Sequence, residues 1–138
     1  MKKFIMLITV FTVAVILPSF AQSIGGTTTA HNAPFMGTLP SATLAGLTGG
    51  NITISTIMNA DTLSTKNSSF KVVGFTLSSM ISGSPVNYSS TSNQIETRMK
   101  EAMKKLVVGN VVTFKDIKAK YKPTGSIHAL SQMTFTIN

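Results

Sequence analysis

The clearest strand pattern in the chain is Phe70-Lys71-Val72-Val73-Gly74-Phe75-Thr76-Leu77. Apolar or small side chains occupy both sets of alternating positions in this run. A strand with two apolar faces is typical of the interior of a sheet whose two sides are both covered. We therefore predict that residues 70–77 form a central strand with cover on both faces.

Shorter patterns stand on either side of this strand. Upstream, residues 52–58 contain three isoleucines and a methionine, and their spacing fits either a short strand or one helical turn. Downstream, Gly83, Ser84 and Pro85 are turn-forming residues, so we expect a turn there and a short strand from Val86 to Tyr88.

One amphipathic helix is expected over residues 94–106. Its apolar side chains fall on one face at helical spacing, at Ile95, Met99, Ala102, Met103 and Leu106. Asn93 and Glu96 fit a capping box at the start of the helix. Glu96 with Lys100, and Glu101 with Lys105, stand four residues apart and predict two ion pairs on the solvent face.

The segment after this helix alternates like a strand, but its apolar phase changes between Phe114 and Ile117. One extra residue in a strand restores the inward phase, so we predict a β-bulge near Lys115 and Asp116. A hairpin-like turn at residues 123–125 and a closing strand at 133–137 follow.

Together these patterns predict an α+β, mainly β fold. We expect a β-sandwich-like antiparallel sheet of five or more strands, with the one amphipathic helix (residues 94–106) packed on it. The chain has no cysteine, so disulfides and thiolate metal sites are excluded and stability must come from a hydrophobic core.

The first residues have the pattern of a secretory signal peptide. Two lysines precede an apolar run from Phe4 to Leu17, and small residues at Ser19 and Ala21 fit the subsites of a signal peptidase. A membrane-spanning helix needs roughly 20 apolar residues, and this run is shorter. We therefore expect cleavage between Ala21 and Gln22, export to the periplasm or out of the cell, and no stable membrane anchor.

The exported part divides into a lead-in and one domain. Residues 22–49 are rich in Gly, Thr, Ala and Pro and show no period, which indicates a flexible lead-in. Phe35 and Leu44 are apolar exceptions that either dock on the domain or bind something else. Residues 50–138 are expected to form the domain itself.

The chain is poor in groups that perform catalysis. Beyond the signal segment it offers the acids and histidines Asp61, Glu96, Glu101, Asp116, His31 and His128. One interpretation of His128 is a base for Ser126 or Ser131. A catalytic triad also needs an acid that orients the histidine ring, so we interpret His128 as a strand-edge histidine in solvent. There is no phosphate loop, zinc spacing or calcium loop. We expect no enzyme activity and no cofactor.

Charge points to an anionic partner. The chain has 12 Lys and Arg against 4 Asp and Glu. Removal of the two signal-segment lysines leaves 10 against 4, a net charge of +6. There is no Trp and no pattern of aromatic and arginine residues that would stack on bases, so an acidic protein or envelope surface is favoured over nucleic acid.

Four of these positive charges follow the bulged strand, at Lys115, Lys118, Lys120 and Lys122. Two interpretations are open. The row either forms a solvated face that protects an edge strand from unwanted pairing, or it forms a docking patch for a partner.

Several pieces of the sequence resemble the C-terminal domain of GldM, the periplasm-spanning subunit of the gliding-motility and type IX secretion machinery. The similar pieces, in the same order, are residues 70–77, the helix, residues 109–119, the turn at 123–126, Leu130 and residues 133–137. The resemblance covers about residues 49–138, and its most specific part is the run from Phe114 to Ala119 followed by the Pro-x-Gly turn. In GldM this domain is a protein-contact module, and the family supplies no catalytic residues to carry over.

The sequence also departs from that family. GldM has an N-terminal transmembrane helix and a long series of periplasmic domains, so the resemblance implies a stand-alone copy of the contact domain, and dimerisation does not transfer. The expected function is a non-catalytic, exported interaction module that docks on envelope or secretion-apparatus proteins or self-associates through sheet edges. The alternative is a carbohydrate-binding or surface adhesin module, which is disfavoured because only Tyr88 and Tyr121 accompany the core phenylalanines.

Overall fold

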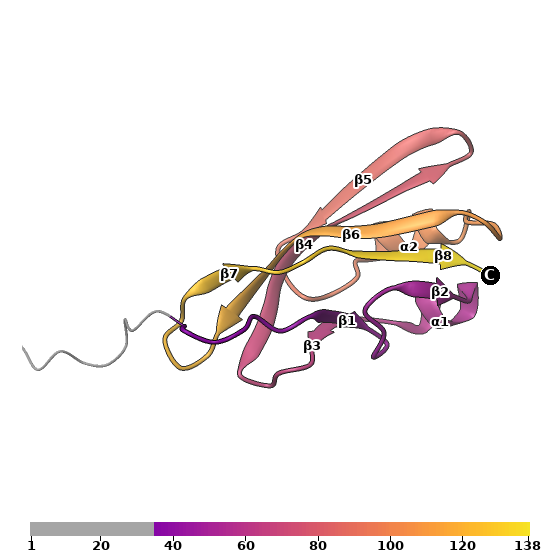
Figure 1. The fold of residues 1–138 in the computed structure, drawn as a ribbon. Helices are drawn as coiled ribbons and strands as arrows, with labels where there is room; N and C mark the ends of the chain where they lie inside the picture. The colour runs from indigo at the N-terminus through magenta and orange to yellow at the C-terminus, as the bar shows by residue number, and fades with distance from the viewer. Residues whose placement is uncertain (1–34) are drawn as a thin grey trace, which may run out of the picture.

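The computed structural model describes residues 35–138 (Figure 1). The predicted cleavage after Ala21 and the first part of the lead-in lie outside these residues. In chain order the elements are β1 (Ala42–Leu44), β2 (Gly50–Ile52), α1 (Ile54–Asn59), β3 (Leu63–Thr65), β4 (Phe70–Ile81), β5 (Ser84–Ser90), α2 (Thr97–Met103), β6 (Val111–Tyr121), β7 (Ile127–Ala129) and β8 (Met133–Ile137). Neither helix of residues 35–138 combines the length and the hydropathy that a membrane crossing needs.

The strands form one large sheet and one small one. The large sheet has the order β2-β8-β6-β4-β5, and β7 also pairs with β6. Its described pairs are antiparallel, except that β2 runs parallel to β8. β1 and β3 pair separately. The α+β, mainly β class is therefore confirmed. A sandwich is not confirmed, the large sheet is mixed, and residues 35–138 contain two helices where one was predicted.

The predicted strand at residues 70–77 is confirmed and extends to Ile81, with β6 on one side and β5 on the other. The prediction that both of its faces are covered is wrong. Phe70 and Val72 are buried in one phase, and Phe75 and Leu77 are buried in the other. The register with β6 leaves Val73 without a partner residue, so an extra residue on β4 changes the phase. The two-sided apolar pattern is thus the signature of a bulge.

The predicted bulge on β6 is confirmed. Gly74 pairs with Lys118 and Thr76 pairs with Lys115, so two residues of β6 stand opposite the single residue Phe75. Asp116, one of these two, has a left-handed backbone with φ of 52°. Aspartate tolerates this conformation better than most residues do. The two bulges are offset by one residue pair, and together they keep the apolar side chains of both strands on the same side of the sheet.

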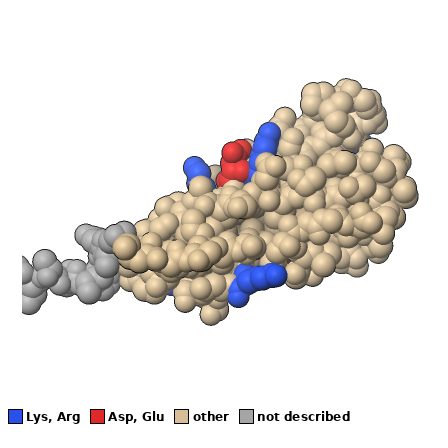
Figure 2. Space-filling model, in the orientation of Figure 1, with Lys and Arg blue, Asp and Glu red and all other residues tan. Residues whose placement is uncertain are grey.

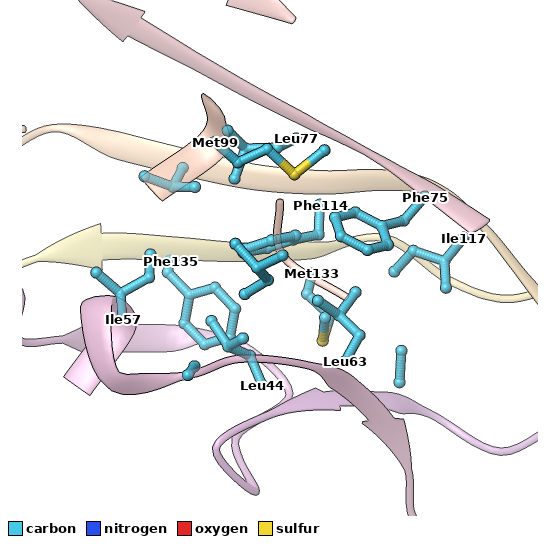
Figure 3. Close-up of a cluster of buried hydrophobic side chains, with 14 of the residues drawn as sticks. Leu44, Ile57, Leu63, Phe75, Leu77, Met99, Phe114, Ile117, Met133 and Phe135 are labelled. Carbon is cyan, nitrogen blue, oxygen red and sulfur yellow. The ribbon is translucent and has the colours of Figure 1, made fainter. Parts of the chain in front are cut away.

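A single hydrophobic core fills one side of the large sheet. Phe114 lies between Phe75 and Phe135, with ring centroids 5.8 Å and 6.1 Å away (Figure 3). Leu44 of β1 and Leu63 of β3 face these rings from the opposite layer. α1, α2 and the β1–β3 pair therefore cover this side. The other side of the large sheet remains open to solvent, because its side chains are exposed or half-buried. We call it the open face.

The lead-in is shorter than the sequence indicated. Every residue of β1 is buried, and Leu44 is fully enclosed. Phe35 packs on Phe70 and Tyr121, with ring centroids 5.0 Å away in both cases. The prediction of a flexible segment up to residue 49 is therefore wrong from residue 42 onward, since the chain there pairs with β3 and completes the core. A three-residue strand is too short to show a period, which explains the error.

The helix α2 spans fewer residues than predicted, but its buried face is correct. The five apolar residues of the predicted stripe are all buried. The capping box is wrong. The N-cap is Glu96, whose side chain makes no capping bond, and the Asn93 side-chain amide instead donates to the carbonyl of Leu63 at 3.4 Å.

The ion pairs on α2 also differ from the prediction. Glu96 binds Arg98 at 2.8 Å, Glu101 binds Lys104 at 2.5 Å, and Lys100 binds Asp61 near α1. The early end of the helix at Met103 and the loop that carries Asp61 offer nearer partners than the residues four positions away. Each acid of this region is nevertheless paired.

The remaining short elements show which of the predicted conformations these segments adopt. Residues 50–59 form both a short strand and a short helix, and Thr53 caps the helix by accepting from the Thr56 N–H at 3.1 Å. The turn after β4 is the dipeptide Ser82-Gly83, with positive φ at both residues, so Ser84 and Pro85 already belong to β5. The closing strand is confirmed as β8, and β7 was not predicted.

Candidate functional site

The strand β6 presents the predicted lysines on the open face. Ile117 and Ala119 are buried in the core, so Lys118 and Lys120 point to the opposite side and are exposed, while Lys115 is half-buried. β6 lies inside the sheet, between β8 and β7 on one side and β4 on the other. The interpretation that these lysines protect an edge strand is therefore wrong.

A fifth lysine joins them across the strands. Lys71 of β4 is exposed and pairs directly with Lys120 of β6. Like charges that stand opposite each other in a sheet destabilise it. Lys122 is also exposed, just beyond the end of β6. We call Lys71, Lys115, Lys118, Lys120 and Lys122 the lysine face. Lys71 was missed because alternation along one strand does not reveal which residue of another strand lies opposite.

Few negative charges offset the lysine face. Three of the four acids of the chain bind basic residues of α2 or of its C-cap. The fourth, Asp116, is exposed in the bulge and forms no ion pair with residues 35–138. Figure 2 shows acidic and basic atoms near the middle of the upper margin and a second group of basic atoms at the lower margin, on a face that is otherwise largely uncharged. Five cations with one anion among them give this face a net positive charge.

Two shallow hollows border these lysines. One, of about 160 Å³, is lined in part by Lys71, Lys122 and Asn93. The other, of about 270 Å³, includes Lys118 and Asp116 and is otherwise lined mainly by glycine, serine and threonine. Pairing of β4 with β5 begins only at Phe75, so the first hollow lies beside the part of β4 that β5 does not cover. The second hollow lies where that pairing begins, since Thr76, Ser89 and Ser90 also line it. The lysine face therefore has hydroxyl and amide groups beside its cations, in two shallow hollows.

The histidine that the sequence singled out lies on an edge strand, as predicted, but it is not fully exposed to solvent. His128 lies on β7 and is half-buried, and its ring packs 5.9 Å from the rings of Phe35 and Phe70. Its Nε2 forms a hydrogen bond with Ser126 Oγ at 2.8 Å. No carboxylate within residues 35–138 forms a hydrogen bond with this histidine. The pair has the distance of a nucleophile and base but lacks the third, orienting group.

Residues 35–138 contain no candidate metal site. The structure brings no three His, Cys, Asp or Glu residues of the segment 35–138 close enough to hold a metal ion together. The lysine face is therefore the strongest candidate site among the described residues.

Neither a scan against protein-family models nor a search of curated proteins found a match to this chain.

Proposed function

We propose that this chain is an exported, non-catalytic protein-contact module whose lysine face binds an acidic surface of an envelope or secretion-apparatus protein. The observation that carries the proposal is the direct pairing of Lys71 with Lys120, on a face where Asp116 is the one acid of its strand. A sheet that places like charges opposite each other gives up stability. An anionic partner would recover it by neutralising those charges.

The resemblance to the C-terminal domain of GldM supports the partner class. In that family the domain works by contact with other proteins of the envelope machinery. The proposal keeps export to the periplasm or beyond, on the basis of the N-terminal signal pattern.

A carbohydrate-binding role receives less support from the arrangement of the aromatic side chains. Tyr121 is half-buried and packs against Phe70 at 4.9 Å, and Tyr88 is also half-buried. Sugar sites usually present a free aromatic ring, and neither tyrosine offers both of its faces. We therefore favour a protein partner.

The test compares two double variants with the same change in charge. Lys118→Glu with Lys120→Glu reverses the centre of the lysine face, whereas Lys66→Glu with Lys104→Glu reverses two exposed lysines elsewhere. Each protein, expressed from the full coding sequence and shown to be folded, captures partners from envelope extract. The captured partners are identified by mass spectrometry, purified and measured for binding in dilute and concentrated salt.

We expect the first double variant to lose binding and the second to keep it. Binding of the wild type should weaken between about 0.1 M and 1 M salt, since the screening length falls from about 10 Å to about 3 Å. Association should slow more than dissociation accelerates, as for other exposed charges. Equal binding by both double variants at both salt concentrations would refute the role of the lysine face.

A further inference from the structure

A groove separates β5 from α2 on the core side of the sheet edge. It has a volume of about 410 Å³, and its apolar floor is formed by Ile81, Val86, Tyr88 and Ala102. Arg98 and Lys105 border it from the helix side. Positions 98, 101 and 105 recur at three- and four-residue spacing, so they project from the same side of this segment. In Figure 1 the β4–β5 hairpin extends beyond the rest of the sheet at the upper right.

The strand β5 is also an edge whose peptide groups are partly free. β5 pairs with β4 on one side only. Peptide groups in a strand point alternately to the two sides. Pro85 has no N–H, and the Ser89 carbonyl accepts from Arg98 Nη2 at 2.6 Å, so residues 85, 87 and 89 direct their peptide groups away from β4. The N–H and C=O of Asn87 and the N–H of Ser89 are thus available to another strand.

The charges beside the groove are not balanced. Arg98 binds Glu96, and Glu101, which also lines the groove, binds Lys104. Lys105 forms no ion pair with any residue between 35 and 138. One end of the groove therefore carries an uncompensated positive charge beside apolar side chains.

We propose that this groove binds an extended acidic peptide, which adds as a further strand beside β5. Its main chain would bond to Asn87 and Ser89, an apolar side chain would pack on Val86 and Tyr88, and a carboxylate two residues away would meet Lys105. Strand addition of this kind takes affinity from main-chain bonds and specificity from alternate side chains. The inference rests on the proposed function only in that the partner is a polypeptide, because the groove lies apart from the lysine face.

The geometry limits the length of the bound segment. Pro85 removes the outward donor at one end of β5, and the Arg98 guanidinium already occupies the Ser89 carbonyl at the other. The free peptide groups between these two points span about three residues. Both features also keep β5 from pairing indiscriminately, since proline and charged side chains are common protection for edge strands. The side-chain contacts must therefore select the partner.

The first test uses a blocked peptide, acetyl-Thr-Val-Thr-Asp-Thr-amide, added to the ¹⁵N-labelled protein expressed from the full coding sequence. We expect saturable NMR shifts of the Asn87 and Ser89 amides. Two further peptides carry an N-methyl group, one on Val and one on the central Thr. Because alternate peptide groups face β5, one of these two should lose binding and the other should keep it. An absence of saturable shifts up to about 5 mM peptide, or equal binding of the three peptides, would overturn the proposal.

The second test uses matched charge variants. Lys105→Glu should weaken binding of the peptide about fivefold, the effect of one partly exposed charge pair. Lys66→Glu, an equal change of an exposed lysine outside the groove, should leave the affinity within about twofold. A peptide with Lys in place of Asp should prefer the Lys105→Glu protein. The same loss in both variants would refute the groove.

The Lys118→Glu, Lys120→Glu double variant separates this inference from the proposed function. It should bind the peptide as the wild type does, even where it loses the envelope partner. Loss of peptide binding in this variant would move the peptide site to the lysine face and overturn the groove. Normal peptide binding beside unchanged partner capture would instead reject the lysine face and leave the groove standing.

Discussion

Replacement of Phe114 by alanine tests the whole strand arrangement, because this ring joins three strands. Phe114 lies on β6, is fully buried, and contacts Phe75 of β4 and Phe135 of β8. Its neighbour Thr113 points to the open face, where its hydroxyl lies 3.4 Å from that of Thr134. A shift of one residue in the phase of β6 would exchange these two environments.

The expected magnitude follows from burial. A buried aromatic side chain removes roughly 150–250 Å² from water, which at about 25 cal/mol/Å² amounts to roughly 4–6 kcal/mol. Alanine retains part of this, and the cavity that remains adds a cost, so Phe114→Ala should lower the free energy of unfolding by about 3–5 kcal/mol. Phe114→Leu keeps most of the volume and should cost about 1–2 kcal/mol. Thr113→Ala should cost less than about 1 kcal/mol.

Urea unfolding of the four proteins, followed by circular dichroism, measures these differences. The slope of the unfolding free energy against urea should be the same for all of them, since the surface exposed on unfolding does not change. If Phe114→Ala leaves the protein folded but lowers its stability by less than about 1 kcal/mol, or by no more than Thr113→Ala does, the phase of β6 described above is wrong. If Phe114→Ala does not fold, the leucine variant still ranks the two positions.

Three further predictions concern the bulge, one ion pair and the signal segment. Asp116→Val should lower the unfolding free energy by about 1–2 kcal/mol, because a β-branched residue resists the left-handed backbone, whereas Asp116→Gly should not lower it, and urea unfolding checks both. Lys100→Ala should cost less than about 1 kcal/mol in the same assay, since its partner Asp61 is 78% exposed, and a larger loss would show a buried role. N-terminal sequencing of the exported protein should begin at Gln22, and retention of Met1 in a membrane-integral product would contradict cleavage.

The patterns that predicted the fold correctly were those long enough to show a period. The strand at residues 70–77 and the apolar stripe of the helix each repeat several times, and both are present. The bulge near Asp116 was also predictable, because a change of phase between Phe114 and Ile117 leaves one residue to be accommodated. These predictions depend only on the local spacing of apolar residues.

The errors share a physical cause, since they concern contacts between distant segments. β1 needs β3 as its partner, and Lys71 meets Lys120 only because β4 and β6 lie side by side. Lys100 binds Asp61 and not Glu96, its predicted partner. A sequence read along its length gives the faces of each strand but not which strand is its neighbour.

The strand β4 shows how strongly strand pairing determines which face of a strand is exposed. An apolar pattern on both sides of β4 indicated a strand covered on both faces, and a covered strand has no surface for a partner. The bulge at Val73 explains the same pattern with one covered face. The other face of β4 is therefore exposed. The second bulge, at Asp116, keeps Lys115 on the same side of the sheet as Lys118 and Lys120. The two bulges therefore keep the apolar side chains of β4 and β6 in the core and also keep the lysines together on the open face. A change that removed one bulge would disturb both the stability of the fold and the proposed binding.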